Sequence, residues 1–230
     1  MFLDVGGVFH LPSPELIGEA LRRAGVETPT DPAVFDRAHY AGAKALETWP
    51  IGDEPGIWSA YERAYAVECG VPEDRLDDAI AELDVTFAQE GIWGRLAPGS
   101  LEGLRALADT GVTLAIVSNS DGTLERRLRD EGICQVGPGK GVPMRIIIDS
   151  DVVGVAKPDP AIFHLALEAC GVAPERVLHI GDTVGADVDG ALAAGVRPVH
   201  LDPYGFCDDD SHPHVKAVGD VAAALLDDAD

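Results

Sequence analysis

The chain has 230 residues, of which 46% are hydrophobic and 25% are charged, a composition typical of a globular protein that can bury a core. Its 17 basic residues against 40 acidic ones give a formal net charge of −23. This balance argues against partners such as nucleic acid or an anionic membrane surface, because both require clustered Lys and Arg. An anionic substrate would therefore need a local cationic site.

The cysteines are far apart in the sequence and form no Cys-x-x-Cys pair. They are Cys69, Cys134, Cys170 and Cys207. A disulfide framework and a zinc site are therefore both unexpected. The chain shows no signal-peptide core at its start and no apolar run of membrane-spanning length. These features predict a soluble, cytoplasmic protein.

Residues 1–9 read as a short buried strand that ends at Asp4 and is followed by Gly6 and Gly7. A carboxylate at the end of a buried strand is costly to desolvate unless a cation or hydrogen bonds meet it. Asp4 is therefore a candidate nucleophile or metal ligand, and an Asp that merely caps a turn is the alternative. Because only three residues precede Asp4, we expect either a very short strand or a true start that lies upstream.

The next part of the chain is predicted to be helical. After a turn-rich bridge at 10–14, apolar residues at helical spacing predict a helix over 16–24. Three more helices, separated by Gly and Pro, are predicted over 32–49, 57–69 and 72–88. No strand pattern occurs in this block, which predicts an inserted all-helical subdomain over 14–95.

From Pro98 onward, strands and helices alternate. Strands are predicted over 112–117, 145–148, 176–180 and 198–201, with a glycine-rich loop before the second of them. Helices are predicted over 99–109, 122–131, 160–170 and 187–194, with a last helix from about Asp220. Strands that are apolar on both faces and joined by helices indicate a parallel sheet covered on both sides. Residues 1–13 and 96–230 are thus predicted to form a doubly wound, Rossmann-like α/β core with a parallel sheet of about five strands.

Polar side chains cluster at the ends of these strands and in one loop. They are Asp4, Ser118, Asn119, Lys157, Asp182 and Asp187. Taken singly, Ser118 and Asn119 could cap the following helix, and Asp187 could be a helix N-terminal acid. Lys157 could be a solvated loop lysine, although the proline after it favours an extended backbone. Together they predict a site, because ligands bind at the carboxyl ends of parallel strands.

In their order along the chain these motifs resemble the haloacid dehalogenase-like hydrolase superfamily. Asp4 matches the aspartate of the first motif and Ser118 the Ser or Thr of the second. Lys157, in Val-Ala-Lys-Pro-Asp-Pro, matches the third, and residues 181–187, Gly-Asp-Thr-Val-Gly-Ala-Asp, match the acidic fourth. The resemblance covers about residues 2–203 and implies that the helical block is the family's cap, inserted between the first two motifs.

The resemblance implies a Mg²⁺-dependent phosphatase of a small phosphorylated metabolite, with Asp4 as nucleophile and an aspartyl-phosphate intermediate. The implied metal ligands are Asp4, the carbonyl of Gly6, Asp182 and, from the first or second shell, Asp187. The implied substrate-binding residues are Ser118, Asn119 and Lys157, of which Lys157 is also catalytic.

One position departs from the pattern. Phosphatases of this superfamily usually carry a second Asp two residues after the nucleophile, where this chain has Gly6. That Asp acts as general acid/base, and such help is typically worth about 10²–10⁴-fold in rate. Two alternatives to the phosphatase follow: a 2-haloacid dehalogenase-type hydrolase, which also lacks this Asp and needs no metal, and a non-catalytic binding or regulatory protein.

Overall fold

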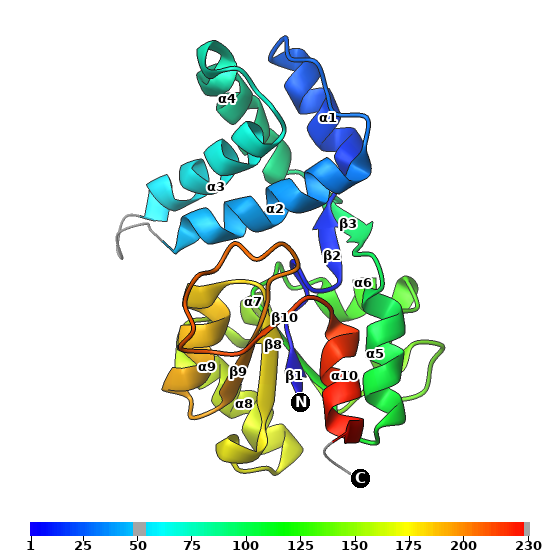
Figure 1. The fold of residues 1–230 in the computed structure, drawn as a ribbon. Coiled ribbons are helices and arrows are strands. Elements are labelled where there is room, and N and C mark those ends of the chain that lie inside the picture. The colour runs from blue at the N-terminus through cyan, green and yellow to red at the C-terminus, as the bar shows by residue number, and fades with distance from the viewer. Residues whose placement is uncertain (48–53, 228–230) are drawn as a thin grey trace. The chain divides into compact units, whose positions relative to one another are not determined.

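The computed structural model describes residues 1–47 and 54–227, and the chain divides into two compact units (Figure 1). Unit 1 comprises Met1–Phe9, Pro98–Pro203 and Asp209–Asp230, and unit 2 comprises His10–Ala97 and Tyr204–Asp208. The inserted subdomain predicted over 14–95 falls within unit 2. The short segment Tyr204–Asp208 is an addition to unit 2 that the sequence did not predict.

A six-stranded parallel sheet, in the order β10-β9-β8-β1-β4-β7, forms the centre of unit 1. Its strands are β1 (Phe2–Leu3), β4 (Ala115–Ser118), β7 (Ile147–Asp149), β8 (Leu178–Gly181), β9 (Arg197–Leu201) and β10 (His214–Val215). The predicted α/β fold with a parallel sheet is confirmed. The sixth strand, β10, was not predicted, because two residues are too few to show a strand pattern.

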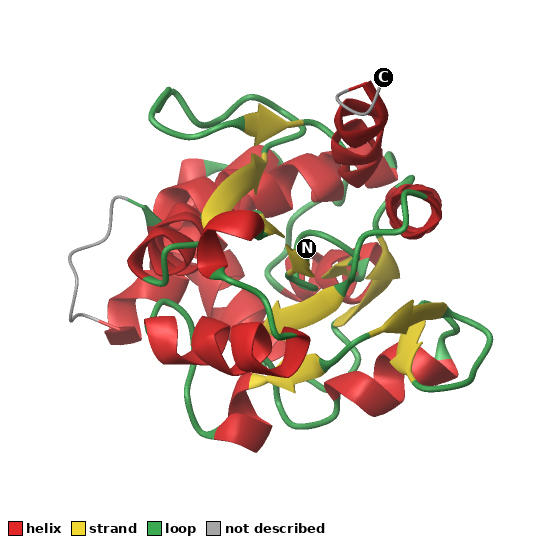
Figure 2. Ribbon diagram, turned by 90° about the horizontal axis from the view of Figure 1, so that it is seen from below, coloured by secondary structure: helices red, strands yellow, loops and turns green. Residues whose placement is uncertain are grey.

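Helices cover both faces of this sheet (Figure 2). Successive strand residues point to opposite faces, so Leu3 and Phe2 of β1 enter two different apolar clusters. The cluster around Leu3 includes residues of α5 (Ser100–Asp109), α6 (Leu124–Asp130) and α10 (Val218–Asp227). The cluster around Phe2 includes residues of α7 (Ser150–Val153), α8 (Pro160–Cys170) and α9 (Gly190–Ala193). Burial on both faces explains why the strands are apolar throughout.

The glycine-rich segment before β7, which was predicted to be a loop, contains regular secondary structure. It contains a separate parallel pair, β5 (Cys134–Val136) and β6 (Val142–Met144). The Gln135 side chain closes the turn between them, because its Oε1 accepts a hydrogen bond from the Gly141 N–H at 2.8 Å and its Nε2 donates to the Gly141 carbonyl at 3.0 Å.

Unit 2 is built on four helices: α1 (Pro14–Arg23), α2 (Pro32–Leu46), α3 (Glu54–Glu68) and α4 (Leu76–Phe87). Their apolar faces share one core, in which Leu21, Phe35, Tyr65 and Leu83 come from the four helices in turn. Unit 2 also contains an antiparallel pair, β2 (His10–Pro12) and β3 (Trp93–Leu96), which the all-helical prediction did not include.

Three helices begin with the same device, a capping side chain followed by proline. The side chains of Ser13, Asp31 and Asp159 accept backbone hydrogen bonds at the starts of α1, α2 and α8, respectively. These caps explain why the predicted helix starts were close to the observed ones. The predicted end of the second helix, at Trp49, lies outside the described residues, and α2 ends at Leu46.

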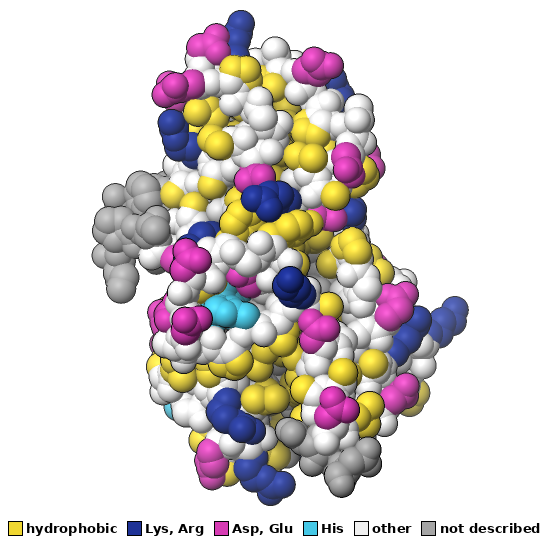
Figure 3. All heavy atoms as spheres, viewed as in Figure 1, with side chains coloured by type: hydrophobic (Ala, Val, Ile, Leu, Met, Phe, Trp, Pro, Cys, Tyr) yellow, Lys and Arg dark blue, Asp and Glu magenta, His cyan; other side chains and the backbone are white. Residues whose placement is uncertain are grey.

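Among the described residues, no helix is long and apolar enough to cross a membrane. Acidic side chains are spread over the visible face of each unit and do not gather into one patch (Figure 3). This distribution agrees with an acidic, solvated surface.

Glu62, buried on α3, should make the stability of unit 2 depend on pH. Burial and, to a smaller extent, Asp84 raise its pKa from about 4.5 to about 7. The folded chain therefore binds a proton that the unfolded chain has already lost, so stability should fall as pH rises through this window. Above it, Glu62→Gln should raise the free energy of unfolding by about 1 to 3 kcal/mol relative to wild type.

Urea unfolding followed by tryptophan fluorescence would measure this effect, because all three tryptophans lie in the sequence of unit 2. Below about pH 4.5 the variant and wild type should unfold alike. Glu90→Gln, at an exposed position, is the matched control. A gain from Glu62→Gln that is equally large at acidic pH would contradict the titration as its cause.

Candidate active site at the carboxyl edge of the sheet

Three adjacent strands of unit 1 deliver polar side chains to one edge. β1 lies between β4 and β8, and Leu3 pairs with Ile116 on one side and Ile180 on the other. Because the strands are parallel, their carboxyl ends lie at the same edge. Asp4, Ser118 and Asp182, which were predicted from the sequence to end these strands, therefore leave the sheet side by side.

Lys157, from the loop between α7 and α8, joins two of the carboxylates. Its Nζ lies 2.8 Å from Oδ1 of Asp4 and 2.6 Å from Oδ1 of Asp187, and its side chain is only 1% exposed. Burial alone would lower the pKa of Lys157, but the charges of Asp187 and Asp4 outweigh it and raise the pKa above its ordinary value. The ammonium is therefore charged throughout the physiological pH range.

Asp187 is surrounded by donors. Its Oδ1 accepts hydrogen bonds from Lys157 and from Nε2 of His179, at 2.6 and 2.8 Å. Its Oδ2 accepts from the Thr183 hydroxyl at 2.7 Å and from the Thr183 N–H at 3.2 Å. Burial alone would raise the pKa of Asp187, but Lys157 and His179 hold it well below its usual range. These contacts fit a carboxylate that anchors Lys157.

Three residues at this edge were missed by the sequence reasoning. Burial lowers the pKa of His179, so its neutral ring donates through Nε2 to Asp187, and Thr183 donates to the same carboxylate. Asp149, at the end of β7, accepts from the N–H groups of Gly122 and Leu124 and so holds the loop after β4. The only signal for His179 was a polar residue inside an otherwise apolar strand.

Asp4 is in the opposite electrostatic situation. Its pKa is raised to about 7: burial raises it most, Lys157 lowers it in part, and the nearby charges of Asp187 and Asp182 raise it as well. Asp4, Asp182 and Asp187 each offer a carboxylate oxygen, and these atoms lie within 4.8 Å of one another. Three buried carboxylates beside one ammonium leave excess negative charge. The donor set therefore fits a divalent cation that prefers oxygen ligands, such as Mg²⁺.

Two glycines allow the backbone to approach these carboxylates closely. A Cβ at Gly7 would lie 2.2 Å from Cγ of Asp182, and the Gly7 φ of +65° is in the left-handed region. A Cβ at Gly181 would lie 2.0 Å from Cγ of Asp187. Gly6 differs from both, because its φ is outside the left-handed region and no atom lies within 4 Å of an added Cβ. The position of Gly6 therefore has room for a side chain.

Asn119 fixes the backbone of Lys157 from both sides. Its Oδ1 accepts from the Lys157 N–H at 2.8 Å, and its Nδ2 donates to the Lys157 carbonyl at 3.0 Å. This positioning role was not foreseen from the sequence, and the substrate contact expected for Asn119 stays a prediction. Ser118 is buried at the end of β4, with its hydroxyl 3.5 Å from the Asn119 carbonyl.

The two carboxylates that contact Lys157 should respond oppositely to neutralisation. Asp4→Asn should stabilise the metal-free protein by about 1 to 3 kcal/mol at about pH 8, because it removes a charge that burial disfavours. Asp187→Asn should destabilise it by about 3 to 5 kcal/mol, because it leaves the buried Lys157 without its main partner. Urea unfolding in the presence of a chelator would measure both changes.

Asp189→Asn is the control, since Asp189 is exposed and belongs to the same π-helical turn, Val184–Asp189. Its stability should match that of wild type. Shifts of the same sign for Asp4→Asn and Asp187→Asn would refute the division of roles between these carboxylates.

Comparisons with known proteins identify the family of the chain. The haloacid dehalogenase-like hydrolase family matches residues 7–195. A phosphoserine phosphatase of Thermus thermophilus is 31% identical over 197 residues, which are 86% of this chain and 74% of that protein. A phosphoglycolate phosphatase of Rhodospirillum rubrum is 34% identical over 184 residues, which are 77% of this chain and 70% of that protein.

Among solved structures, a 2-haloacid dehalogenase of Pseudomonas syringae is similar with a TM-score of 0.55 at 22% identity, covering 100% of this chain and 98% of that chain. This likeness concerns the fold alone. The family match begins just after Asp4 and Gly6, and it includes Ser118, Lys157 and the segment 181–187. The chain belongs to the haloacid dehalogenase-like hydrolase family.

Proposed function

We propose that the chain is a Mg²⁺-dependent phosphatase of a small phosphorylated metabolite that acts through an aspartyl-phosphate on Asp4. The observation that carries this proposal is the buried group of Asp4, Asp182 and Asp187 around Lys157. A nucleophilic carboxylate beside a fixed ammonium suits attack on a phosphoryl group, whose oxygens carry the charge that the ammonium would neutralise.

The reaction would proceed in two displacements. One carboxylate oxygen of Asp4 attacks phosphorus, the phosphorus–oxygen bond to the leaving group breaks, and the departing oxygen takes a proton from water. A water molecule then attacks phosphorus, breaks its bond to Asp4 and releases inorganic phosphate, which restores the carboxylate. Because position 6 is glycine, no side chain at that position protonates the leaving group or activates the water.

Lys157 and Ser118 would bind the phosphoryl oxygens. The Lys157 ammonium is held in place by Asp187 and by the Asn119 contacts to its backbone, so it needs little reorganisation when substrate binds. The Ser118 hydroxyl lies at the end of the adjacent strand and can donate one further hydrogen bond.

Bound Mg²⁺ would neutralise phosphoryl charge and orient the substrate. Asp4, the Gly6 carbonyl and Asp182 are its proposed protein ligands, which leaves coordination positions for water and substrate. Asp187 could coordinate the ion directly or support it from outside the ligand shell. The supporting position is favoured, because donors from Lys157, His179 and Thr183 already contact its oxygens.

The substrate class follows from the curated relatives. The two curated relatives described above, which are 31% and 34% identical to this chain, are named as phosphatases of small phosphorylated compounds, phosphoserine and phosphoglycolate. The fold alone does not choose between a phosphatase and a dehalogenase, since a 2-haloacid dehalogenase shares it. The acidic group favours the phosphatase, because a metal-free reaction would use Asp4 as nucleophile and Asp187 as the anchor of Lys157 but would have no role for the third carboxylate, Asp182.

Hydrolysis of p-nitrophenyl phosphate tests the proposal most directly, because its good leaving group makes a general acid least necessary. Turnover should require Mg²⁺ and stop when a chelator is added. Asp4→Asn should lower kcat by more than about 10³-fold, since it removes the nucleophile. Asp189→Asn should leave kcat unchanged.

Turnover that persists with chelator, or in Asp4→Asn, would refute a metal-dependent aspartyl nucleophile. Halide release from 2-chloropropionate would instead identify a dehalogenase. A folded protein that binds Mg²⁺ but hydrolyses no phosphoester of a broad panel would identify a binding or regulatory role, which is the alternative that Gly6 favours.

Gly6→Asp should increase activity. The position accepts a side chain without strain or collision, and an Asp there would supply the missing general acid/base. For alkyl phosphates, whose leaving groups need a proton, we expect kcat/KM to rise by about 10²–10⁴-fold, and for p-nitrophenyl phosphate by much less. Gly6→Asn, similar in size but unable to donate an acidic proton, is the control, and an equal gain in both variants would contradict acid/base catalysis.

A further inference from the structure

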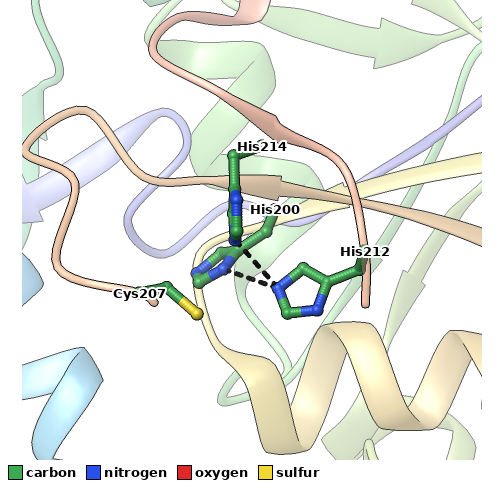
Figure 4. A group of neighbouring side chains, drawn as sticks. All are labelled: His200, Cys207, His212 and His214. Carbon is green, nitrogen blue, oxygen red and sulfur yellow. Dashed lines mark hydrogen bonds between the residues drawn. The ribbon is translucent and has the colours of Figure 1, made fainter. Parts of the chain in front are cut away.

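Three histidines of unit 1 lie together, and one of them contacts the backbone carbonyl of Asp182 (Figure 4). The parallel pairing of β9 with β10 places His214 opposite His200, and His212 lies two residues before His214. Nε2 of His212 is 3.2 Å from Nδ1 of His200 and 3.1 Å from Nε2 of His214. His200 and His212 are buried, and His214 is exposed.

The outer ring nitrogens of two of these histidines face oxygen acceptors. Nε2 of His200 lies 3.1 Å from the Asp182 carbonyl, which can only accept, so this nitrogen carries the proton and Nδ1 presents a lone pair. Nδ1 of His212 faces the Ser211 hydroxyl at 3.4 Å and the Asp209 carboxylate at 3.8 Å. With the proton of His212 on Nδ1, the lone pair of its Nε2 points toward Nδ1 of His200.

This arrangement of protons is typical of metal-binding histidines. A ligating imidazole usually donates its other N–H to a carbonyl or carboxylate, which fixes the tautomer. Lone pairs 3.2 Å apart repel one another unless a cation lies between them. One shared proton can join two of these nitrogens but not three. A tetrahedral zinc ion with zinc–nitrogen bonds of 2.0–2.1 Å would place its ligand nitrogens about 3.3 Å apart, close to the distances of 3.2 and 3.1 Å between these histidines.

We propose that His200, His212 and His214 form a structural site for a Zn²⁺-type ion, separate from the carboxylate group at Asp4. The three rings offer ligand nitrogens within 4.8 Å of one another. Their donors are all imidazole nitrogens, which suit zinc and not magnesium. A water molecule would complete the shell.

Such an ion would fasten the end of unit 1's sheet. It would link β9 to the two-residue strand β10, and through His200 it would fix the carbonyl of Asp182. His214 is an exposed member of the three, so an ion could enter without unfolding.

Calorimetric titration of tag-free, chelator-stripped full-length protein with Zn²⁺ would test the site. Excess Mg²⁺ would be present throughout to compete at the carboxylates. Wild type should bind one equivalent of zinc with a rise in thermal midpoint. His212→Ala and His214→Ala should each weaken binding by at least about tenfold, as expected when a metal site loses a supporting contact or a ligand.

His164→Ala is the matched control, because His164 is exposed on α8 and outside the cluster, and it should bind zinc as wild type does. His214→Ala, at an exposed position, keeps the test valid if His212→Ala fails to fold. Absence of zinc binding by wild type, or unchanged affinity in a folded His214→Ala variant, would overturn the proposal. So would zinc binding that Asp4→Asn abolishes and the histidine variants do not affect.

Discussion

The buried ammonium of Lys157 is the interaction on which the rest of the candidate site depends. An amine that is 1% exposed stays charged only because Asp4 and Asp187 lie within 2.8 Å of it. The two carboxylates are not equivalent. Asp187 also receives hydrogen bonds from His179 and Thr183, whereas Asp4 faces the negative charge of Asp182. Their pKa values are therefore driven apart, and this separation supports an anchoring role for Asp187 and the proposed nucleophilic role for Asp4.

The backbone around Lys157 is shaped to keep this arrangement. Asn119 binds the N–H and the carbonyl of Lys157, so the loop cannot rotate without breaking both hydrogen bonds. Gly7 and Gly181 leave space that a Cβ would take from the carboxylates of Asp182 and Asp187. The site is thus a property of loops held from several directions, with the strands supplying only their starting points.

The sequence could predict a residue of this site only where the pattern of neighbouring residues marks its position. Asp4, Ser118 and Asp182 could be found because each ends an apolar strand, and a parallel sheet brings such ends to one edge. His179 could not, because its role depends on a residue of the following turn reaching back to it. The strand pairs β2–β3 and β9–β10 also escaped prediction, because each includes a strand of only three or two residues, β2 or β10, which is too short to show a pattern of its own.

The expectation that no zinc site exists relied on cysteine spacing, and it did not consider histidines brought together by β10. With those histidines included, Asp182 connects the two proposed ion sites, since its carboxylate belongs to the acidic group and its carbonyl accepts from His200. The two proposed sites would bind different ions because their donors differ: oxygen ligands select magnesium, and imidazole nitrogens select zinc. We therefore expect the chemical identity of the donors, and not the formal charge of −23, to decide which cation each proposed site would bind.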